Sequence, residues 1–419
     1  MNNVNRKILV PQYMQKFKCI GSACEDTCCA GWRVTIDEKT YKHYKNTNES
    51  EIKDLLREKV KRNRSNANEQ NYAKILLDKQ GSCPFLTGDK LCKIQQKLGF
   101  EALSITCAVY PRLTREVNGV MERSATLSCP EIARLVLLNP EPMEFDEIEE
   151  NVPDIFRIEK KIDTYALSVS NKPERYFWEL RIFTIQLLQN RKFKLWERLV
   201  ILGLFYQKLQ IAIDENKVKE IPELIAKYIN MINSDVFENM LNDIPAQINI
   251  QMKLLKELTD IRVIKGVSSK RYMESLGEFL VGIKYTKEAT VEEVGERYKE
   301  AYSNYYEPYM REKEYILENY LVNYVFKNTF PLSGEKNLFD NYVMLIIHYA
   351  LIKMHLIGIS GFQKENFNTD HIIKLVQSLA KTFEHNNSFL KQLFDLLKGN
   401  EFVTMAHMAI LIKNWRWVN

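Results

Sequence analysis

The chain has 419 residues, of which 45% are hydrophobic and 27% are charged. This length predicts two or three domains whose cores can fold without disulfide staples. The net charge is only +5 and no nucleic-acid-binding motif is recognisable, so we expect no nucleic-acid partner.

The N-terminal residues MNNVNRKILVPQYMQKF contain no apolar run of signal-peptide length before Pro11. We therefore expect a cytoplasmic protein. In that reducing compartment, clustered cysteines hold metals more often than they form disulfides.

All eight cysteines lie in the first third of the chain, at Cys19, Cys24, Cys28, Cys29, Cys83, Cys92, Cys107 and Cys129. This clustering predicts one functional unit, a small cysteine-rich α+β metal-binding module over residues 1–138. Within it, Trp32, Val34 and Ile36 alternate with polar residues, which is typical of a short strand. Asp37 is then placed to cap a following helix.

Residues 139–157 differ in composition from the chain segments that precede and follow them. The segment NPEPMEFDEIEENVPD, residues 139–154, has three prolines and seven acidic residues. We interpret residues 139–157 as an acidic, proline-rich linker.

Helical periodicity dominates residues 158–419. Leu195, Leu199, Leu202, Phe205 and Leu209 follow each other in steps of three and four, as on one helix face. The most apolar stretch, residues 342–360, contains two histidines and a lysine, which favours a buried helix over a membrane span. The predicted fold is mainly α, with the cysteine-rich module followed by a large all-helical domain and no membrane association.

The cysteine spacing is C-x4-C-x3-C-C, followed by more widely separated cysteines. Disulfides require an oxidising compartment, and a structural zinc site usually draws on two close cysteine pairs. An iron–sulfur cluster tolerates looser spacing, and eight thiols suffice for one cluster with spare cysteines or for two. Cys28 and Cys29 are adjacent, so one of them is the more natural ligand while the other is buried or meets a second centre.

Two common cofactor patterns are absent. Radical S-adenosylmethionine (SAM) enzymes use CxxxCxxC, but here Cys28 is followed directly by Cys29. No G-x-G-x-x-G follows a predicted strand, so no Rossmann site is visible.

Several motifs resemble the flagellin lysine N-methylase family: VPQYMQKFKCIGSACEDTCCAGWRVTID, CPFL, TCAVYPR and LSCPE, with LENYLVNYVFKNTFP and YALIKMHLIGIS further on. The resemblance covers most of the chain. The cysteine region is also similar to small proteins described as zinc or iron chelators.

The resemblance implies SAM-dependent methylation of lysine side chains in flagellin. It also implies an iron–sulfur cluster, of the 4Fe-4S type, bound by the N-terminal cysteines, with zinc as the alternative metal. All eight cysteines carry over as candidate ligands, because the motifs do not distinguish among them.

Three further residues are candidates near such a centre. Arg112 could pair with the SAM carboxylate or balance the charge of a thiolate cluster. Tyr110 could accept or relay the lysine proton, or simply pack. Asp26 could attract the substrate ammonium, or lie in a solvated turn.

A non-catalytic alternative is a zinc or iron–sulfur scaffold or chaperone with a helical interaction domain. An electron carrier is a third possibility, although electron transfer alone does not need so large a helical part. A scaffold should neither bind nor consume SAM, which distinguishes it from a methyltransferase.

Overall fold

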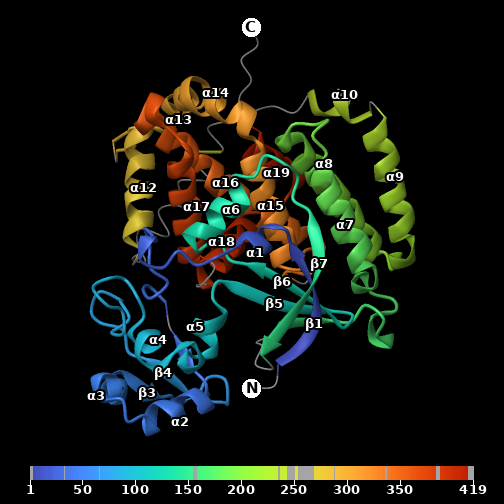
Figure 1. The fold of residues 1–419 in the computed structure, drawn as a ribbon. Helices are drawn as coiled ribbons and strands as arrows, with labels where there is room; N and C mark the ends of the chain where they lie inside the picture. Colours follow the sequence, from blue (N-terminus) through green and yellow to red (C-terminus); the bar gives the residue numbers. More distant parts are fainter. Residues whose placement is uncertain are drawn as a thin grey trace. The chain divides into compact units, whose positions relative to one another are not determined.

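The computed structural model describes residues 3–32, 34–65, 67–153, 158–234, 236–242, 251–252, 269–286, 288–335, 337–383 and 387–413. The chain forms two compact units (Figure 1). The first comprises residues 1–116, 120–135 and 145–161, and the second comprises residues 117–119, 136–144 and 162–419.

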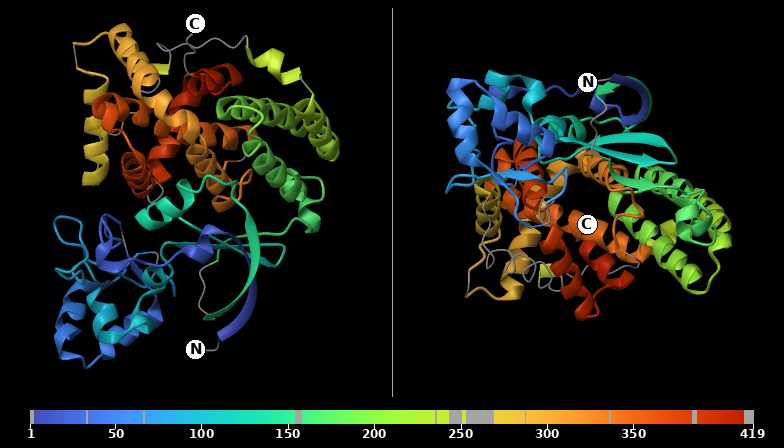
Figure 2. Two further views of the ribbon diagram at one scale, coloured as in Figure 1. Left: turned by 45° about the horizontal axis from the view of Figure 1, so that its top comes forward. Right: turned by 90° about the horizontal axis from the view of Figure 1, so that it is seen from below.

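A five-stranded mixed sheet has the strand order β7-β1-β6-β5-β8. Its strands are β1 (Asn3–Pro11), β5 (Arg112–Val117), β6 (Val120–Ala125), β7 (Phe145–Pro153) and β8 (Ile158–Ile162). β1 runs parallel to β6 and antiparallel to β7, and Figure 2 shows β1 and β7 side by side. Ile8 and Val10 of β1 pack with Met121 in a small core. The short helices α1 (Tyr13–Lys16) and α6 (Pro130–Leu137) follow β1 and β6 in the chain.

The segment that we interpreted as a linker contains an ordered strand. β7 pairs with the whole of β1, and its acidic residues meet polar residues of the first strand and the helix after it. Lys7 Nζ lies 2.9 Å from Glu147 Oε1, and Gln15 donates to Asp146 at 2.6 Å. The acidic composition thus reflects the charge partners of an edge strand, which local sequence does not reveal.

A second, three-stranded sheet has the order β2-β4-β3. Its strands are β2 (Thr35–Ile36), β3 (Val60–Arg62) and β4 (Ala73–Ile75), accompanied by the helices α2 (Glu38–Asn46), α3 (Ser50–Lys59), α4 (Lys93–Leu98) and α5 (Ile105–Val109). Asp37 caps α2 as predicted, because its carboxylate accepts from the Thr40 amide at 2.9 Å. Val34 and Ile36 lie in the buried cluster beneath this sheet.

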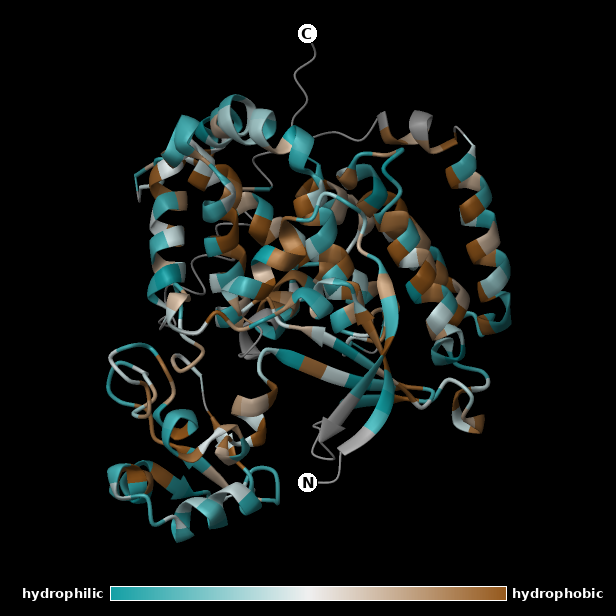
Figure 3. Ribbon diagram, in the orientation of Figure 1, coloured by the Kyte–Doolittle hydropathy of each residue, from teal (hydrophilic) through white to brown (hydrophobic). Residues whose placement is uncertain are grey.

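The second unit is built from helices. They are α7 (Phe177–Leu188), α8 (Leu195–Asp214), α9 (Ile221–Asn233), α10 (Val236–Asn242), α12 (Lys270–Gly282), α13 (Val291–Ala301), α14 (Glu307–Met310), α15 (Tyr315–Lys327), α16 (Leu338–Gln363), α17 (Thr369–Phe383), α18 (Asn387–Gly399) and α19 (Met405–Ile412). The five apolar residues predicted to share one face of α8 are all buried. Figure 3 shows the apolar residues gathered on α7, α8, α15 and α16.

Helix α16 is the central element of the second unit, and α8, α12, α13, α17 and α19 pack against it. It is the one described helix long and apolar enough to cross a membrane, and 89% of its apolar window is buried inside the fold. The prediction of a buried helix over residues 342–360 is therefore confirmed.

α12 approaches α16 closely because glycines replace side chains at the contact. A Cβ atom at Gly282 would lie 1.8 Å from the carbonyl oxygen of Gly358, and one at Gly358 would lie 2.3 Å from the Phe279 ring. The predicted mainly helical fold is observed, but the five-stranded mixed sheet was not expected from the sequence.

Candidate functional site

The first four cysteines lie on an irregular segment between β1 and β2 of the first unit. A 3-10 turn, Gly21–Ala23, leads into Cys24, which has an extended backbone. The Thr27 hydroxyl accepts from the Cys29 amide at 3.0 Å, and the Trp32 indole donates to the Cys28 carbonyl at 2.8 Å. These bonds fix the turn that carries the adjacent pair, whose sulfur atoms lie 4.0 Å apart.

Backbone pairing brings distant cysteines to this segment. The Cys83 amide donates to the Cys29 carbonyl at 2.7 Å, and Ala30 and Ser82 form an antiparallel bridge. A second bridge joins Leu86 to Cys92, the residue that immediately precedes α4. Chain segments more than fifty residues apart in sequence are thereby joined through their backbones.

Cys107 and Cys129 are held by short helices. Cys107 lies in α5, where its amide donates to the capping hydroxyl of Ser104 at 3.3 Å. Cys129 precedes α6, and its carbonyl accepts from the Ala133 amide at 2.9 Å. All eight cysteines are free thiols, and all lie in the first unit.

Burial and neighbouring groups raise the pKa of four of these thiols, Cys24, Cys29, Cys107 and Cys129, whereas the hydrogen bond with Cys29 lowers the pKa of Cys83. Burial raises the pKa of Cys107 to about 11 and that of Cys129 to about 11. For Cys29, the hydrogen bond from Cys28 lowers the pKa, but the contact with Cys83 and burial outweigh it and raise the value to about 12. A bound cation would compensate the charge of the thiolates, and metal binding would release their protons.

Within the described residues, no three or more His, Cys, Asp or Glu side chains are gathered closely enough to hold a metal ion. A tetrahedral zinc site with Zn–S distances of about 2.3 Å would bring its sulfurs to about 3.8 Å from one another. The donor chemistry suits zinc or an iron–sulfur cluster, since every candidate is a free thiol. The cysteine-rich metal-binding module and its ligand set therefore stay predictions.

Tyr110 lies beside the cysteine segment. Its ring packs on Trp32 at a centroid distance of 5.5 Å, and its hydroxyl lies 3.1 Å from the Ser128 hydroxyl. Burial raises the pKa of Tyr110 well above its ordinary value, and the charges of Cys129, Cys28 and Asp26 act in the same direction. The phenol is therefore protonated at neutral pH and suits hydrogen donation or proton relay better than direct proton abstraction.

The other two candidates are placed differently. Asp26 lies in the turn between Cys24 and Cys28, where its carboxylate accepts from the Thr27 amide at 2.9 Å. Arg112 begins β5, and its guanidinium lies over the Phe17 ring at 5.1 Å. Among the described residues Arg112 has no carboxylate within ion-pair distance.

Sequence reasoning missed two contacts that organise the segment. Trp32 joins the Cys28 turn to the Tyr110 ring, and Glu25 forms an ion pair with Arg134 of α6. No local spacing marks the contact of Trp32 with Tyr110 or that of Glu25 with Arg134, because these partners are far apart in sequence.

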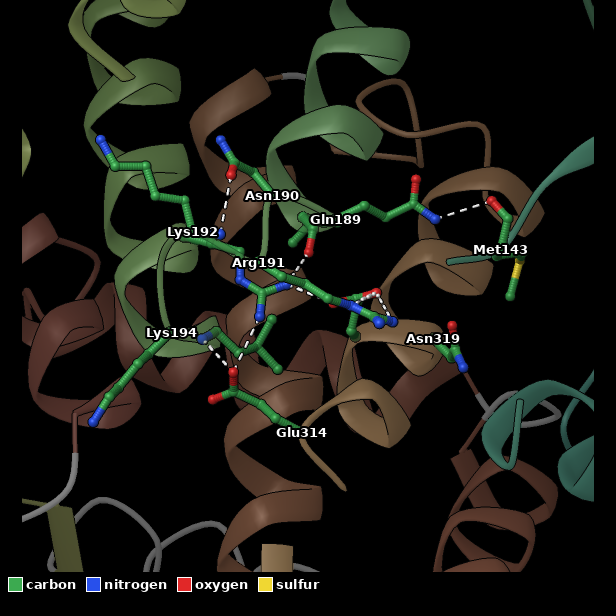
Figure 4. Close-up of polar contacts among 12 residues, drawn as sticks. Met143, Gln189, Asn190, Arg191, Lys192, Lys194, Glu314 and Asn319 are labelled. Atoms are coloured by element: carbon green, nitrogen blue, oxygen red, sulfur yellow. Dashed lines mark hydrogen bonds and ion pairs between the residues drawn. The ribbon is translucent and has the colours of Figure 1, made fainter. Parts of the chain in front are cut away.

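The second unit contains a buried ionic network that the sequence analysis also missed (Figure 4). Glu318 of α15 accepts from Arg198 of α8 at 2.6 Å and from the Arg191 Nη2 at 2.9 Å. Glu314 accepts from Arg198 at 3.0 Å and from the Leu195 amide at 2.9 Å. The network joins α8 to α15 through the buried side chains of Arg198 and Glu318.

Comparison with known proteins places this helical region in a family. Residues 181–411, more than half of the chain, match the family model described as the FliB lysine N-methylase C-terminal domain. The chain belongs to the FliB lysine N-methylase family. The resemblance stated from the sequence motifs is thereby confirmed.

Full-length relatives extend the match beyond the helical region. The chain is 23% identical over 416 residues to the lysine-N-methylases of Salmonella typhimurium and Salmonella choleraesuis, covering 95% of this chain and 98% of each relative. It is 35% identical over 140 residues to the flagellar biosynthetic protein FliU of Salmonella muenchen, covering 33% of this chain and 80% of that relative. No solved structure matches the chain.

Proposed function

We propose that this protein is a SAM-dependent methyltransferase that N-methylates lysine side chains of flagellin and that uses an iron–sulfur site formed by its N-terminal cysteines. The proposal is carried by the end-to-end similarity to two proteins named lysine-N-methylase, which spans 95% of this chain. The name of the flagellar relative supports a flagellar substrate.

Methyl transfer requires a neutral amine, because a protonated lysine, with an ordinary pKa of about 10.4, has no lone pair. The amine nitrogen attacks the methyl carbon of SAM as the carbon–sulfur bond breaks. S-adenosylhomocysteine leaves, and the nitrogen ends with one methyl group more and one proton fewer. The reacting atoms must be held in line and in close contact for this displacement.

The candidate residues divide these tasks by their chemistry. Asp26 attracts the substrate ammonium, and Tyr110 relays the departing proton toward the Ser128 hydroxyl, 3.1 Å away. Arg112, which has a ring contact but no described carboxylate partner, pairs with the SAM carboxylate. If an iron–sulfur cluster were bound, the N-terminal cysteines would hold it and it would supply an electrophilic iron.

The direct test is methylation of purified flagellin by the full chain, prepared without oxygen and supplied with SAM. Mass spectrometry of flagellin peptides should show a mass increase of about 14 Da on a lysine residue for each methyl group transferred. The reaction should also release S-adenosylhomocysteine in proportion.

A matched pair of variants tests the role of Tyr110. Tyr110→Phe removes only the hydroxyl and should lower kcat by about 10²-fold or more if it relays a proton. Tyr44→Phe is the control, because the Tyr44 hydroxyl is buried in the same unit but donates to the Ala102 carbonyl at 2.7 Å. Equal activity of the two variants would remove Tyr110 from the reaction.

The competing function is a non-catalytic zinc or iron–sulfur scaffold or chaperone. A metal-loaded chain that neither binds SAM in calorimetry nor modifies flagellin would favour that alternative and contradict the proposal. Binding of SAM together with methylated flagellin would exclude it.

A further inference from the structure

The strand β7 lies at one edge of the five-stranded sheet. It pairs with β1 and with no other strand in the part of the chain that the structure describes. The pairing with β1 is continuous over all nine residues of β7, from Phe145 to Pro153. The opposite side of β7 therefore has a row of backbone amide and carbonyl groups beside which no described strand lies. An edge of this kind accepts an added strand from another chain unless the protein blocks it.

The side chains of β7 divide between the two faces of the sheet. Ile148 packs against the small core that includes Ile8, the residue directly opposite it on β1. Glu147 and Glu149 flank Ile148 in the strand and therefore point to the other face. Both glutamates are exposed. Two carboxylates thus lie two positions apart on one face of an open edge strand.

Lys7 of β1 shows how this face binds a lysine side chain. Lys7 is directly opposite Glu149 in the register, and its ammonium nitrogen lies 2.9 Å from a carboxylate oxygen of Glu147. The hydrogen bond with Glu147 is the largest cause of the raised pKa of Lys7, and the charge of Glu149 acts in the same direction. Two carboxylates therefore share one lysine from β1. A surplus of negative charge is left for a strand on the other side of β7.

The other edge of the sheet has a different charge. β8 is five residues long and has one acidic residue, Glu159, beside Lys160 and Lys161. Glu159 already pairs with Arg115 of the neighbouring strand at 3.4 Å. A positively charged segment is therefore attracted to the edge at β7 and not to the edge at β8.

We propose that the open edge of β7 is the docking surface for an extended, lysine-bearing segment of the protein substrate. The segment adds to the sheet as a further strand and is held by backbone hydrogen bonds to β7. Lysines at alternate positions of the segment lie on one face and pair with Glu147 and Glu149, as Lys7 does from β1. The substrate is that of the proposed function, on which this inference rests. β7 belongs to the same unit as Asp26 and Tyr110.

The first test measures the binding of labelled, end-blocked peptides to the full chain by fluorescence anisotropy, without SAM. A peptide of alternating lysine and threonine, with the nine residues of β7, should bind. An alternating glutamine–threonine peptide lacks the positive charges. An alternating lysine–proline peptide keeps them but lacks the amide donors that a strand needs. Both control peptides should bind more weakly, and equal binding of either one would overturn the inference.

The second test changes the charges on this face. The double variant Glu147→Gln with Glu149→Gln should weaken binding of the lysine–threonine peptide by roughly two- to thirtyfold, the range for two opposite-charge pairs across strands. Glu159→Gln on β8 is the matched control and should leave binding unchanged. An equal loss in the control would show that general charge attraction binds the peptide, and it would overturn the inference.

A third variant separates charge from damage to the strand. Lys7→Gln removes the same surface ion pair as Glu147→Gln, but it leaves both carboxylates on β7. It should therefore strengthen binding of the lysine–threonine peptide. Weaker binding in Lys7→Gln would show that loss of the ion pair disturbs β7 and would overturn the role of the carboxylates.

Flagellin methylation distinguishes failure of this inference from failure of the proposed function. In the double variant of Glu147 and Glu149, the KM for flagellin should rise while kcat and the KM for SAM stay unchanged. Methylation with an unchanged KM for flagellin would retain the proposed function and overturn the docking surface. Sedimentation supplies a further check, because a dimer of the chain that the double variant dissociates would assign the edge to a second copy and overturn the inference. Peptide binding at β7 in a chain that transfers no methyl group would contradict the proposed function and leave the docking surface standing.

Discussion

Replacing Glu318 by Gln should destabilise the second unit strongly, although the two side chains have nearly the same shape. The Glu318 side chain is 1% exposed and the Arg198 side chain that it pairs with is 2% exposed. Two arginines and two glutamates balance in the network around them. The substitution leaves one positive charge in the interior without a counter-charge.

Removing one partner of a buried ion pair costs about 3–5 kcal/mol. The second unit should therefore unfold at a clearly lower denaturant concentration. Glu307→Gln is the matched control, because Glu307 pairs with Arg311 one turn along an exposed helix. Loss of such a surface pair costs about 0.3–0.5 kcal/mol.

The assay is equilibrium urea unfolding of the full chain, followed by far-ultraviolet circular dichroism and by tryptophan fluorescence. The free energies of unfolding of Glu318→Gln and Glu307→Gln are each compared with the wild type. A double variant, Arg198→Met with Glu318→Leu, should regain part of the loss, because both charges then leave the interior together. If Glu318→Gln lowers the free energy of unfolding no more than Glu307→Gln does, an uncompensated charge in the buried network does not destabilise the second unit.

Two other predictions follow from the second unit. Gly358→Ala should destabilise the chain by about 1–3 kcal/mol, because its methyl group would overlap the Phe279 ring. Gly277→Ala is the control: nothing lies within 4 Å of its new Cβ, so it should be neutral or stabilising by up to about 1 kcal/mol. Thermal unfolding compares the two variants. Burial lowers the pKa of His355 to about 4, below its ordinary value. Its contribution to the free energy of unfolding is therefore complete above about pH 6.5 and is lost as the pH falls toward 4. The loss is at most about 3 kcal/mol. Urea unfolding at a series of pH values should show that the free energy of unfolding falls less steeply with decreasing pH in His355→Gln than in the wild type. Identical pH dependence in the two proteins would contradict a lowered pKa of His355.

Features with a local period could be predicted from the sequence. The apolar face of α8 and the burial of α16 follow from helical spacing and composition, and the Asp37 cap follows from a side chain that satisfies a free helix amide. Each of these depends on residues only a few positions apart.

Features that depend on distant partners could not be predicted. Local sequence would place the Glu318 carboxylate in solvent, but it is paired with Arg198, which lies 120 positions earlier in the chain. The composition of β7 is that of a linker, but its acidic residues pair with Lys7 and Gln15 from the start of the chain. The grouping of Cys29 with Cys83 likewise follows from a backbone pairing that cysteine spacing does not encode.

The chain's own Lys353 shows how methylation of a substrate lysine can be made easier. Its Nζ is buried and donates to the Ile412 carbonyl at 3.0 Å, and burial lowers its pKa to about 8. At pH 7 roughly a tenth of such an amine is neutral, against roughly four in ten thousand for a free lysine. A substrate lysine held in an equally dry site would gain a neutral amine from desolvation alone. Under the proposed function, Tyr110 would then need only to pass the proton onward, which suits a phenol whose own pKa is raised.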